Sequence, residues 1–160
     1  MIIIRDTIEM KTTKEKIFDW FAHIEKNYQI WHKDHKECRY LKGNSLDIGS
    51  IIYCEEYIGG YLEKPRFQII NVKLYSQLEY KLLFPHSIAG ARFVFVVEPY
   101  NASLLFTTEI HLGHNTPLFG RLLDKFIQRL CILFESKLMS VKQHIAEEQQ
   151  NLKRILEEDT

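Results

Sequence analysis

The sequence predicts an α+β fold in which a curved antiparallel sheet of about seven strands surrounds a long C-terminal helix, with two short helices after the first strand. Three observations predict it. Residues 2–10 alternate and are β-branched, residues 38–112 form a series of alternating segments joined by short turns, and an apolar stripe at helical spacing follows Gly113. Because such a sheet has one apolar face to cover, the long helix is expected to pack across it.

The first strand is followed by helix signals. Thr12 and Thr13 offer an N-cap, and Glu15 lies in the first turn that follows. Apolar residues from Ile17 to Ile24 then recur at helical spacing. We expect one helix to about residue 23 and a second short helix over 25–31.

The strands that follow are expected at 38–42, 50–58, 61–74, 77–84, 89–98 and 103–112. Gly59-Gly60 is a favoured two-residue hairpin turn, and breaks at 85–87 and 99–101 separate the later strands. Consecutive strands with short connections predict an antiparallel meander.

The last helix is expected to begin near Pro117, which suits a first helical turn. Its apolar stripe runs through Leu118, Leu122, Phe126, Leu130, Leu133, Phe134, Leu138, Val141, Ile145, Leu152 and Ile155. The charged tail, residues 152–160, is expected to fray.

Length and composition limit the classes of function. The 160 residues suit a single domain over 1–160, and the 21 basic and 21 acidic residues cancel, which argues against nucleic acid or an anionic membrane as a partner. No apolar run reaches the roughly 18–20 residues of a membrane span. Cys38, Cys54 and Cys131 show no metal or redox spacing, so they are expected to be reduced and the protein cytoplasmic.

Two groups of metal-ligand residue types lie far apart in the chain. His32 and His35 follow the second short helix, and His144 and Glu148 share one face of the last helix because they are four residues apart. Glu56 alternates with apolar residues on its strand, so it is expected to point to the apolar face of the sheet. A buried carboxylate there requires a partner or a metal ion.

Each of these residues also has a structural interpretation without metal. His144 and Glu148 could form a surface pair, the two histidines could belong to a polar turn anchored by Trp31, and Glu56 could reach water at the strand end. Glu109 and His111 share another strand face, which we expect to be the solvent face because the opposite face is more apolar.

Ten Phe and eight Tyr residues supply bulky surface that can fill a core or line a cavity for an apolar ligand. The candidates for cavity-lining side chains are Tyr53, Phe67, Tyr80, Leu82, Phe93, Phe95, Phe106, Phe126 and Phe134.

The order of elements and several local phrases resemble the START-like, or helix-grip, superfamily, also called SRPBCC. The phrases are Ile17-Phe18-Asp19-Trp20-Phe21 with Ile30-Trp31-His32, Asp47-Ile48-Gly49-Ser50, Leu78-Glu79-Tyr80-Lys81, and the terminal amphipathic helix. The resemblance covers essentially the whole chain. It implies that the C-terminal part of the long helix lies over the two short helices, with His144 near the turn at 31–35.

A narrower resemblance concerns the candidate metal ligands. His32, Asp34 and His35, the Glu55-Glu56-Tyr57 segment, and His144 with Glu148 before Asn151-Leu152 are similar to the diacetylphloroglucinol hydrolases. These are START-like zinc enzymes that cleave a carbon–carbon bond in an acylated phenol. The resemblance implies a zinc ion held by His35 or His32, Glu56, His144 and Glu148.

Two hypotheses for the function follow. The protein could be a small-molecule-binding START-like domain with a divalent metal site, acting as a hydrolase or cyclase on a polyketide-like aromatic ketone. Alternatively, it could be a non-enzymatic carrier or sensor of a lipid or another hydrophobic small molecule. Metal content that survives dialysis favours the first, and a metal-free protein that purifies with an apolar ligand favours the second.

Overall fold

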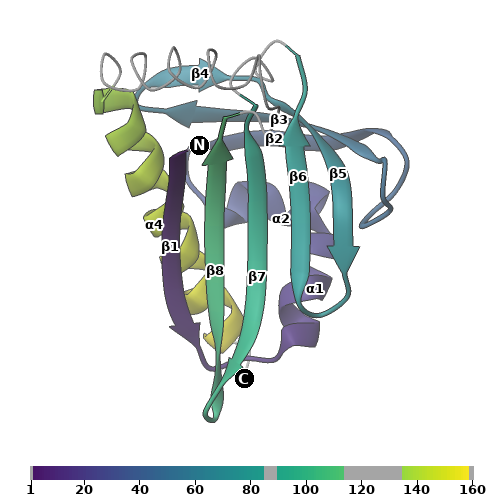
Figure 1. Cartoon of the computed structure of the whole chain (residues 1–160), viewed down its shortest axis with the longest axis vertical. Helices are drawn as coiled ribbons and strands as arrows, with labels where there is room; N and C mark the ends of the chain where they lie inside the picture. Colours follow the sequence, from purple (N-terminus) through teal and green to yellow (C-terminus); the bar gives the residue numbers. More distant parts are fainter. Residues whose placement is uncertain (1, 85–89, 114–134, 159–160) are drawn as a thin grey trace.

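The computed structural model of the protein describes residues 2–84, 90–113 and 135–158 (Figure 1). In chain order its elements are β1 (Ile2–Met10), α1 (Lys14–Ala22), α2 (Ile24–Trp31), β2 (His35–Lys42), β3 (Ile51–Ile58), β4 (Tyr61–Glu63), β5 (Arg66–Lys73), β6 (Gln77–Leu82), β7 (Arg92–Tyr100), β8 (Ser103–Leu112) and α4 (Glu135–Glu158). The α+β fold class expected from the sequence is confirmed.

The described strands form one sheet in the order β1-β8-β7-β6-β5-β3-β2, with β4 paired to β3, and neighbouring strands are antiparallel. It has eight strands rather than about seven, because the segment expected as one strand over 61–74 divides at Lys64-Pro65. Proline has no backbone N–H to give to a ladder. The carbonyl of Pro65 instead accepts a hydrogen bond from the N–H of Cys54 at 3.0 Å.

Helices α1, α2 and α4 lie on one side of the curved sheet (Figure 1). Helix α4 contacts β1, β3 and α2, so the expected packing of the last helix across the sheet is confirmed for residues 135–158. The expected first half of this helix, including Phe126 and Phe134, lies outside the described residues.

Several strand boundaries differ from the sequence-based expectation, and two of the differences have consequences for the sheet. Strand β2 begins at His35 rather than near residue 38, so His35 belongs to the sheet and not to the preceding turn. Pro99 lies within β7, paired with Leu104 of β8. The pairing of β7 with β6 ends at Val96, so β6 does not pair with Pro99. The N–H that proline lacks is therefore not needed for a hydrogen bond to β6.

The expectation that the tail frays is wrong for residues 152–158, which continue α4. Leu152 is fully buried and Leu156 is 6% exposed, both against the core. The helix end is also tied to the loop after β1, because the Glu157 carboxylate accepts a hydrogen bond from the backbone N–H of Lys11 at 2.5 Å. Lys153 donates to the carbonyl oxygen of Glu9 at 2.6 Å.

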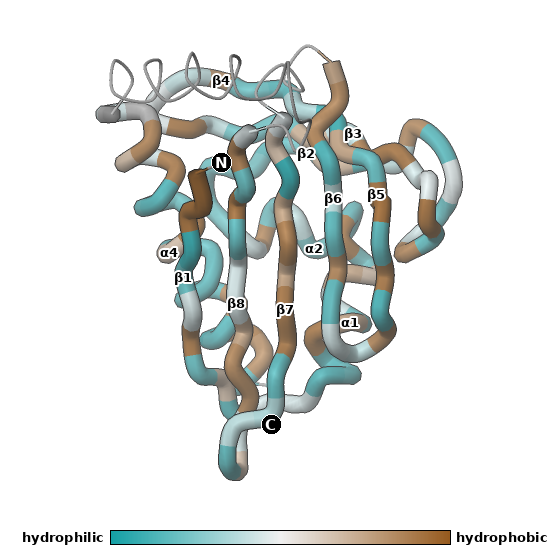
Figure 2. The backbone as a smooth tube through the Cα atoms, in the orientation of Figure 1, coloured by the Kyte–Doolittle hydropathy of each residue, from teal (hydrophilic) through white to brown (hydrophobic). Residues whose placement is uncertain are grey.

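The core lies between the helices and the inner face of the sheet, and aromatic rings fill much of it. Phe21 of α1 packs against Phe95 of β7 with ring centroids 4.8 Å apart, and Phe95 stacks on Phe106 of β8 at 5.9 Å. Trp31 of α2 meets the edge of Phe21 at 5.6 Å. Figure 2 shows the hydrophobic middle of β7, which supplies the centre of this core.

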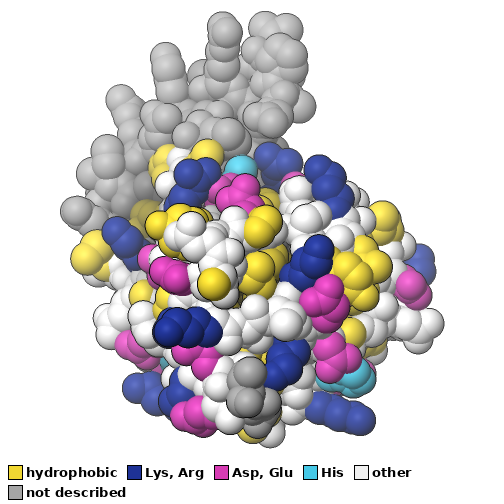
Figure 3. Space-filling model, turned by 90° about the horizontal axis from the view of Figure 1, so that it is seen from below, with side chains coloured by type: hydrophobic (Ala, Val, Ile, Leu, Met, Phe, Trp, Pro, Cys, Tyr) yellow, Lys and Arg dark blue, Asp and Glu magenta, His cyan; other side chains and the backbone are white. Residues whose placement is uncertain are grey.

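Charged residues of both signs are intermingled on the face seen in Figure 3. This arrangement agrees with the balanced count of 21 basic and 21 acidic residues and gives that face no field of a single sign. None of the helices in the described part of the chain has an apolar stretch of the length that a membrane-spanning helix requires.

Leu152→Ala tests the packing of the helix end. Because Leu152 is fully buried, we expect the free energy of unfolding to fall by about 2–5 kcal/mol, measured by urea denaturation. The matched control is Met139→Ala on the same helix, where the side chain is 63% exposed and a loss below about 0.5 kcal/mol is expected. Similar losses in the two variants would contradict the packing.

Glu157→Gln tests the tie between α4 and the loop after β1. The Lys11 backbone N–H, followed by the Lys153 ammonium, lowers the pKa of Glu157. The stabilisation is therefore present at pH values above about 4.3 and lost as the pH falls through the lowered pKa. We expect a loss of about 0.5–1 kcal/mol at pH 7 that vanishes in acid. In the control Glu158→Gln, whose partner is the exposed Arg154, no such pH-dependent loss is expected.

Candidate metal centre

The imidazole of His35 has a fixed orientation at the start of β2. Its Nδ1 lies 2.8 Å from the backbone carbonyl oxygen of Tyr28, and the Tyr28 ring stacks on it at a centroid distance of 3.9 Å. Because a carbonyl only accepts, Nδ1 must carry the proton, and Nε2 of the neutral ring is left with its lone pair. Histidines that bind metals typically have this outer hydrogen bond to a carbonyl.

Helix α4 brings His144 and Glu148 to His35. The indole N–H of Trp31 donates to the backbone carbonyl of Glu148 at 2.9 Å, which fixes α4 against the end of α2. His144 Nε2 then lies 3.3 Å from His35 Nε2, and Glu148 Oε1 lies 3.1 Å from the same nitrogen. The i,i+4 spacing places His144 and Glu148 on one helix face, as the sequence predicted.

Glu56 reaches the same point from β3, where it is paired with His35 of β2. Its Oε2 lies 3.5 Å from His35 Nε2 and 3.3 Å from His144 Nε2. Glu55, its neighbour, points away and pairs with Lys64 at 2.9 Å. The two carboxylates therefore lie on the faces that strand alternation predicted for them.

These four side chains form one group, called here the quartet: His35, Glu56, His144 and Glu148. One ligand atom from each lies within 4.8 Å of all the others. Zinc bonds of about 2.0–2.1 Å in a tetrahedron put neighbouring ligand atoms about 3.3–3.4 Å apart. The nitrogen–nitrogen and nitrogen–oxygen distances given above, 3.1 to 3.5 Å, agree with that value, and the His144–Glu148 distance is longer at 3.9 Å.

The charges of the quartet also suit a divalent cation. Two neutral imidazoles and two carboxylates carry a charge of −2, and these side chains are only 0–14% exposed. Buried carboxylates so close together are costly unless a cation compensates them. Burial by itself lowers the pKa of His144, but the hydrogen bond to Glu56 and the charge of Glu148 outweigh it and raise the pKa.

His32 lies beside the quartet, buried in the turn before β2. Its ring centroid is 4.2 Å from that of His144, and His32, His35 and His144 form a second group whose ligand atoms lie within 4.8 Å of one another. Its Nδ1 accepts the backbone N–H of Asp34 at 3.2 Å, and its Nε2 lies 3.0 Å from Glu147 Oε2. The structure thus brings all five candidate ligands from the sequence together.

Sequence reasoning did not identify the groups that surround the quartet. Tyr28 is buried, and burial, followed by the charge of Glu56, raises the pKa of its phenol far above the usual value. The buried free thiols of Cys38 and Cys54 lie 3.6 Å apart on the paired strands β2 and β3. Tyr28 shares a helix face with Ile24 and Trp31, so its burial could have been read from the spacing, but its position over His35 could not.

All but one of the candidate cavity residues divide into three groups. Tyr80 and Phe106 belong to the buried core, and Phe95 packs against it partly buried. Phe67, Leu82 and Phe93 lie on the inner face of the sheet and are only partly buried. Phe67 meets Phe93 edge to face at 5.3 Å. Phe126 and Phe134 lie outside the described residues.

Tyr53 lies on the other side of the sheet, so its assignment to the cavity was wrong. It alternates with the buried Ile52 and Cys54, and its hydroxyl donates to the carboxylate of Glu55. The guanidinium of Arg39 lies 4.9 Å from its ring centroid. Strand alternation alone could have predicted this position, because Tyr53 and Glu56 point to opposite faces of β3.

Glu109 and His111 lie on the face of β8 opposite the buried Phe106 and Ile110, as expected, but their side chains are only 13% and 17% exposed and are not solvent groups. Glu109 accepts from Arg5 and lies 2.6 Å from His111 Nε2. Phe106 and Ile110, on the inner face, are buried.

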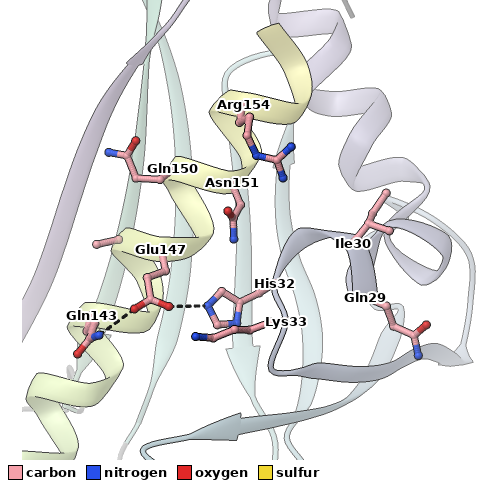
Figure 4. Close-up of a pocket in the computed structure, with 10 residues that line it drawn as sticks. Gln29, Ile30, His32, Lys33, Gln143, Glu147, Gln150, Asn151 and Arg154 are labelled. Atoms are coloured by element: carbon pink, nitrogen blue, oxygen red, sulfur yellow. Dashed lines mark hydrogen bonds and ion pairs between the residues drawn. The ribbon is translucent and has the colours of Figure 1, made fainter. Parts of the chain in front are cut away.

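An open groove of about 670 Å³ lies outside the quartet, between α4 and the end of α2 (Figure 4). Eight of its ten lining residues have polar or charged side chains, and the full set comprises Gln29, Ile30, His32, Lys33, Gln143, Ala146, Glu147, Gln150, Asn151 and Arg154. His32 is the residue that belongs both to this groove and to a group of candidate metal ligands.

Solved structures share this architecture. The ginseng major latex-like protein 151 from Panax ginseng has a TM-score of 0.73 at 12% identity, covering 97% of each chain. A START superfamily protein from Mycobacterium smegmatis has a TM-score of 0.67 at 15% identity, covering 99% of each chain. The Aha1 dimer from Colwellia psychrerythraea has a TM-score of 0.64 at 17% identity, covering 98% of this chain and 97% of that one.

The chain has the helix-grip fold of START-like proteins. No protein-family model matches it, and no curated protein matches it in sequence. At these identities the structural likeness establishes the helix-grip fold alone, so the function must be argued from the site.

Glu56→Gln tests the electrostatics of the quartet. In the metal-free protein, we expect the pKa of His144 to lie above its usual value of about 6.5, and to fall in Glu56→Gln because one of the two carboxylates is neutralised. NMR titration of the histidine resonances measures both. This raised pKa stabilises the metal-free fold below about pH 6.5, and the stabilisation is lost as the pH rises through the folded-state pKa.

The control for this titration is Glu55→Gln, in which the pKa of His144 should remain unchanged because Glu55 points away from the quartet. Equal shifts in the two variants would contradict the arrangement.

Proposed function

We propose that this protein is a helix-grip protein that binds a divalent metal, namely zinc, through His35, Glu56, His144 and Glu148. One observation carries the proposal: a ligand atom from each of the four lies within 4.8 Å of the others, and they come from three separate elements. Imidazole nitrogen and carboxylate oxygen are both zinc ligands. A lone surface pair of His144 and Glu148 would not recruit a buried imidazole and a second carboxylate.

The proposed reaction is metal-dependent hydrolysis or cyclisation of an aromatic, polyketide-like ketone. A divalent ion at the quartet would polarise a ketone oxygen or activate a water molecule as a fifth ligand, because the four side chains would fill a tetrahedron. The chain's own groups prepare the site: the carbonyl of Tyr28 orients His35, and the phenol of Tyr28 stays protonated because its pKa is raised. The resemblance of the ligand pattern to the diacetylphloroglucinol hydrolases supports this class of substrate.

A second candidate function is a carrier of a hydrophobic small molecule. The partly buried aromatic side chains of Phe67 and Phe93 on the inner face of the sheet favour it, because they offer apolar surface near the core. In this case the quartet would only stabilise the fold, and the protein would release its ligand unchanged.

Zinc binding is tested by thermal unfolding of metal-free protein with and without zinc. We expect zinc to raise the Tm of the wild type with increasing concentration, because the ion binds only the folded state. In Glu148→Ala the shift should shrink strongly, because a ligand to the ion is removed. Glu55→Ala is the matched control and should retain the full shift.

The pH dependence of the same shift has a defined sign. Zinc requires neutral imidazoles, so the shift should decrease as the pH falls, and it should begin to decrease above pH 6.5 because the pKa of His144 is raised. Equal Tm values with and without zinc in every variant would refute the metal site. A metal-free protein that purifies with an apolar ligand would then favour the carrier.

A further inference from the structure

The ligand atoms of the quartet are shielded from solvent. The side chain of His35 is fully buried, and those of Glu56, His144 and Glu148 are 8–14% exposed. A divalent cation in water carries a hydration shell that it must exchange for protein ligands. A buried site therefore needs a route along which this exchange can occur in steps.

His32 offers the intermediate step on the groove side of the quartet. It shares two partners with the quartet, because His32, His35 and His144 form a group whose ligand atoms lie within 4.8 Å of one another. His32 would have to give up its hydrogen bond with Asp34 or with Glu147 to free a lone pair for a cation. A cation then held by His32 and His144 could pass to the quartet without ever losing all its protein ligands. His32 also lines the groove of about 670 Å³.

Glu147 offers the first step, at the surface. Its side chain is 39% exposed, and its Oε2 lies 3.0 Å from Nε2 of His32, whose side chain is 1% exposed. Figure 4 shows the two side chains facing each other from α4 and from the turn after α2. The amide of Gln143 donates to the other carboxylate oxygen of Glu147 at 2.8 Å, which holds this side chain at the mouth of the groove.

We infer that Glu147 and His32 form an access route that delivers a divalent cation from the groove to the quartet. The inference rests on the metal site proposed above. Along this route the exposure of the side chain falls from 39% at Glu147 to 1% at His32 and 0% at His35. His144, which lies beside His32, is 8% exposed. The cationic side chains of Lys33 and Arg154 line the same groove and repel a cation. They would therefore slow the entry of the cation into the groove.

The experiment measures the kinetics of zinc uptake by metal-free protein, mixed with zinc in a stopped-flow instrument. Tryptophan fluorescence is a suitable signal, because the indole of Trp31 is bonded to the backbone of Glu148. Equilibrium affinity is measured separately by competition with a chromophoric chelator. The variants are Glu147→Gln and His32→Asn, with Gln150→Ala as the matched control in the same groove.

We expect association and dissociation in both variants to slow together by about tenfold, because each variant removes one step of the route, while the Kd changes by less than about threefold. Lys33→Gln should accelerate association, and Gln150→Ala should change neither rate. Glu147→Gln alters only a partly exposed side chain, so it remains informative if His32→Asn fails to fold.

Unchanged association rates in Glu147→Gln, and in His32→Asn where it folds, would overturn the access route while leaving the metal site intact. A loss of affinity in His32→Asn as large as in Glu148→Ala would also overturn it, because His32 would then be a ligand of the resting site. If the wild type binds no zinc, the proposed metal site fails and the access route fails with it.

Discussion

The docking of α4 against β1 and α2 is the constraint on which the candidate site depends. Two buried hydrogen-bonding groups fix it. Gln149 is almost completely buried and donates both to the backbone carbonyl of Asp6 at 3.1 Å and to the hydroxyl of Thr108 at 3.0 Å. Trp31 donates to the backbone of Glu148 on the other side of the helix. Because these contacts lie at and beside Glu148, they set the rotation of the helix where two candidate ligands project.

This arrangement concentrates polar groups inside an otherwise apolar core. On the inner face of the sheet, Phe21, Phe95 and Phe106 pack ring against ring, while the quartet occupies the side nearer β2 and β3. Carboxylates in such surroundings are stable only when a proton or a cation balances their charge. The quartet therefore couples the stability of the fold to whatever cation it holds, and it is this coupling that makes metal binding measurable through unfolding.

Much of the fold could be predicted from the chain. The ends of β1 and β8 follow directly from alternating hydrophobicity. Gly59 and Gly60 both have the positive φ that a two-residue hairpin turn favours. The errors have local physical causes. A single proline divided the strand expected at 61–74, and the burial of Leu152 and Leu156 kept an apparently charged tail helical.

The sequence by itself determined which residue types were available and which face each would occupy. The i,i+4 spacing of His144 and Glu148, and the alternation that separates Glu56 from Glu55, are local properties set by helix and strand geometry. Only the tertiary structure decided that these faces meet. The convergence depends on the register of β2 against β3 and on the rotation of α4, which are set by long-range contacts such as those of Gln149. The contact of Glu147 with His32 follows from the same docking of α4, and the stacking of Tyr28 on His35 follows from the packing of α2 on β2. Local patterns could not reveal either contact.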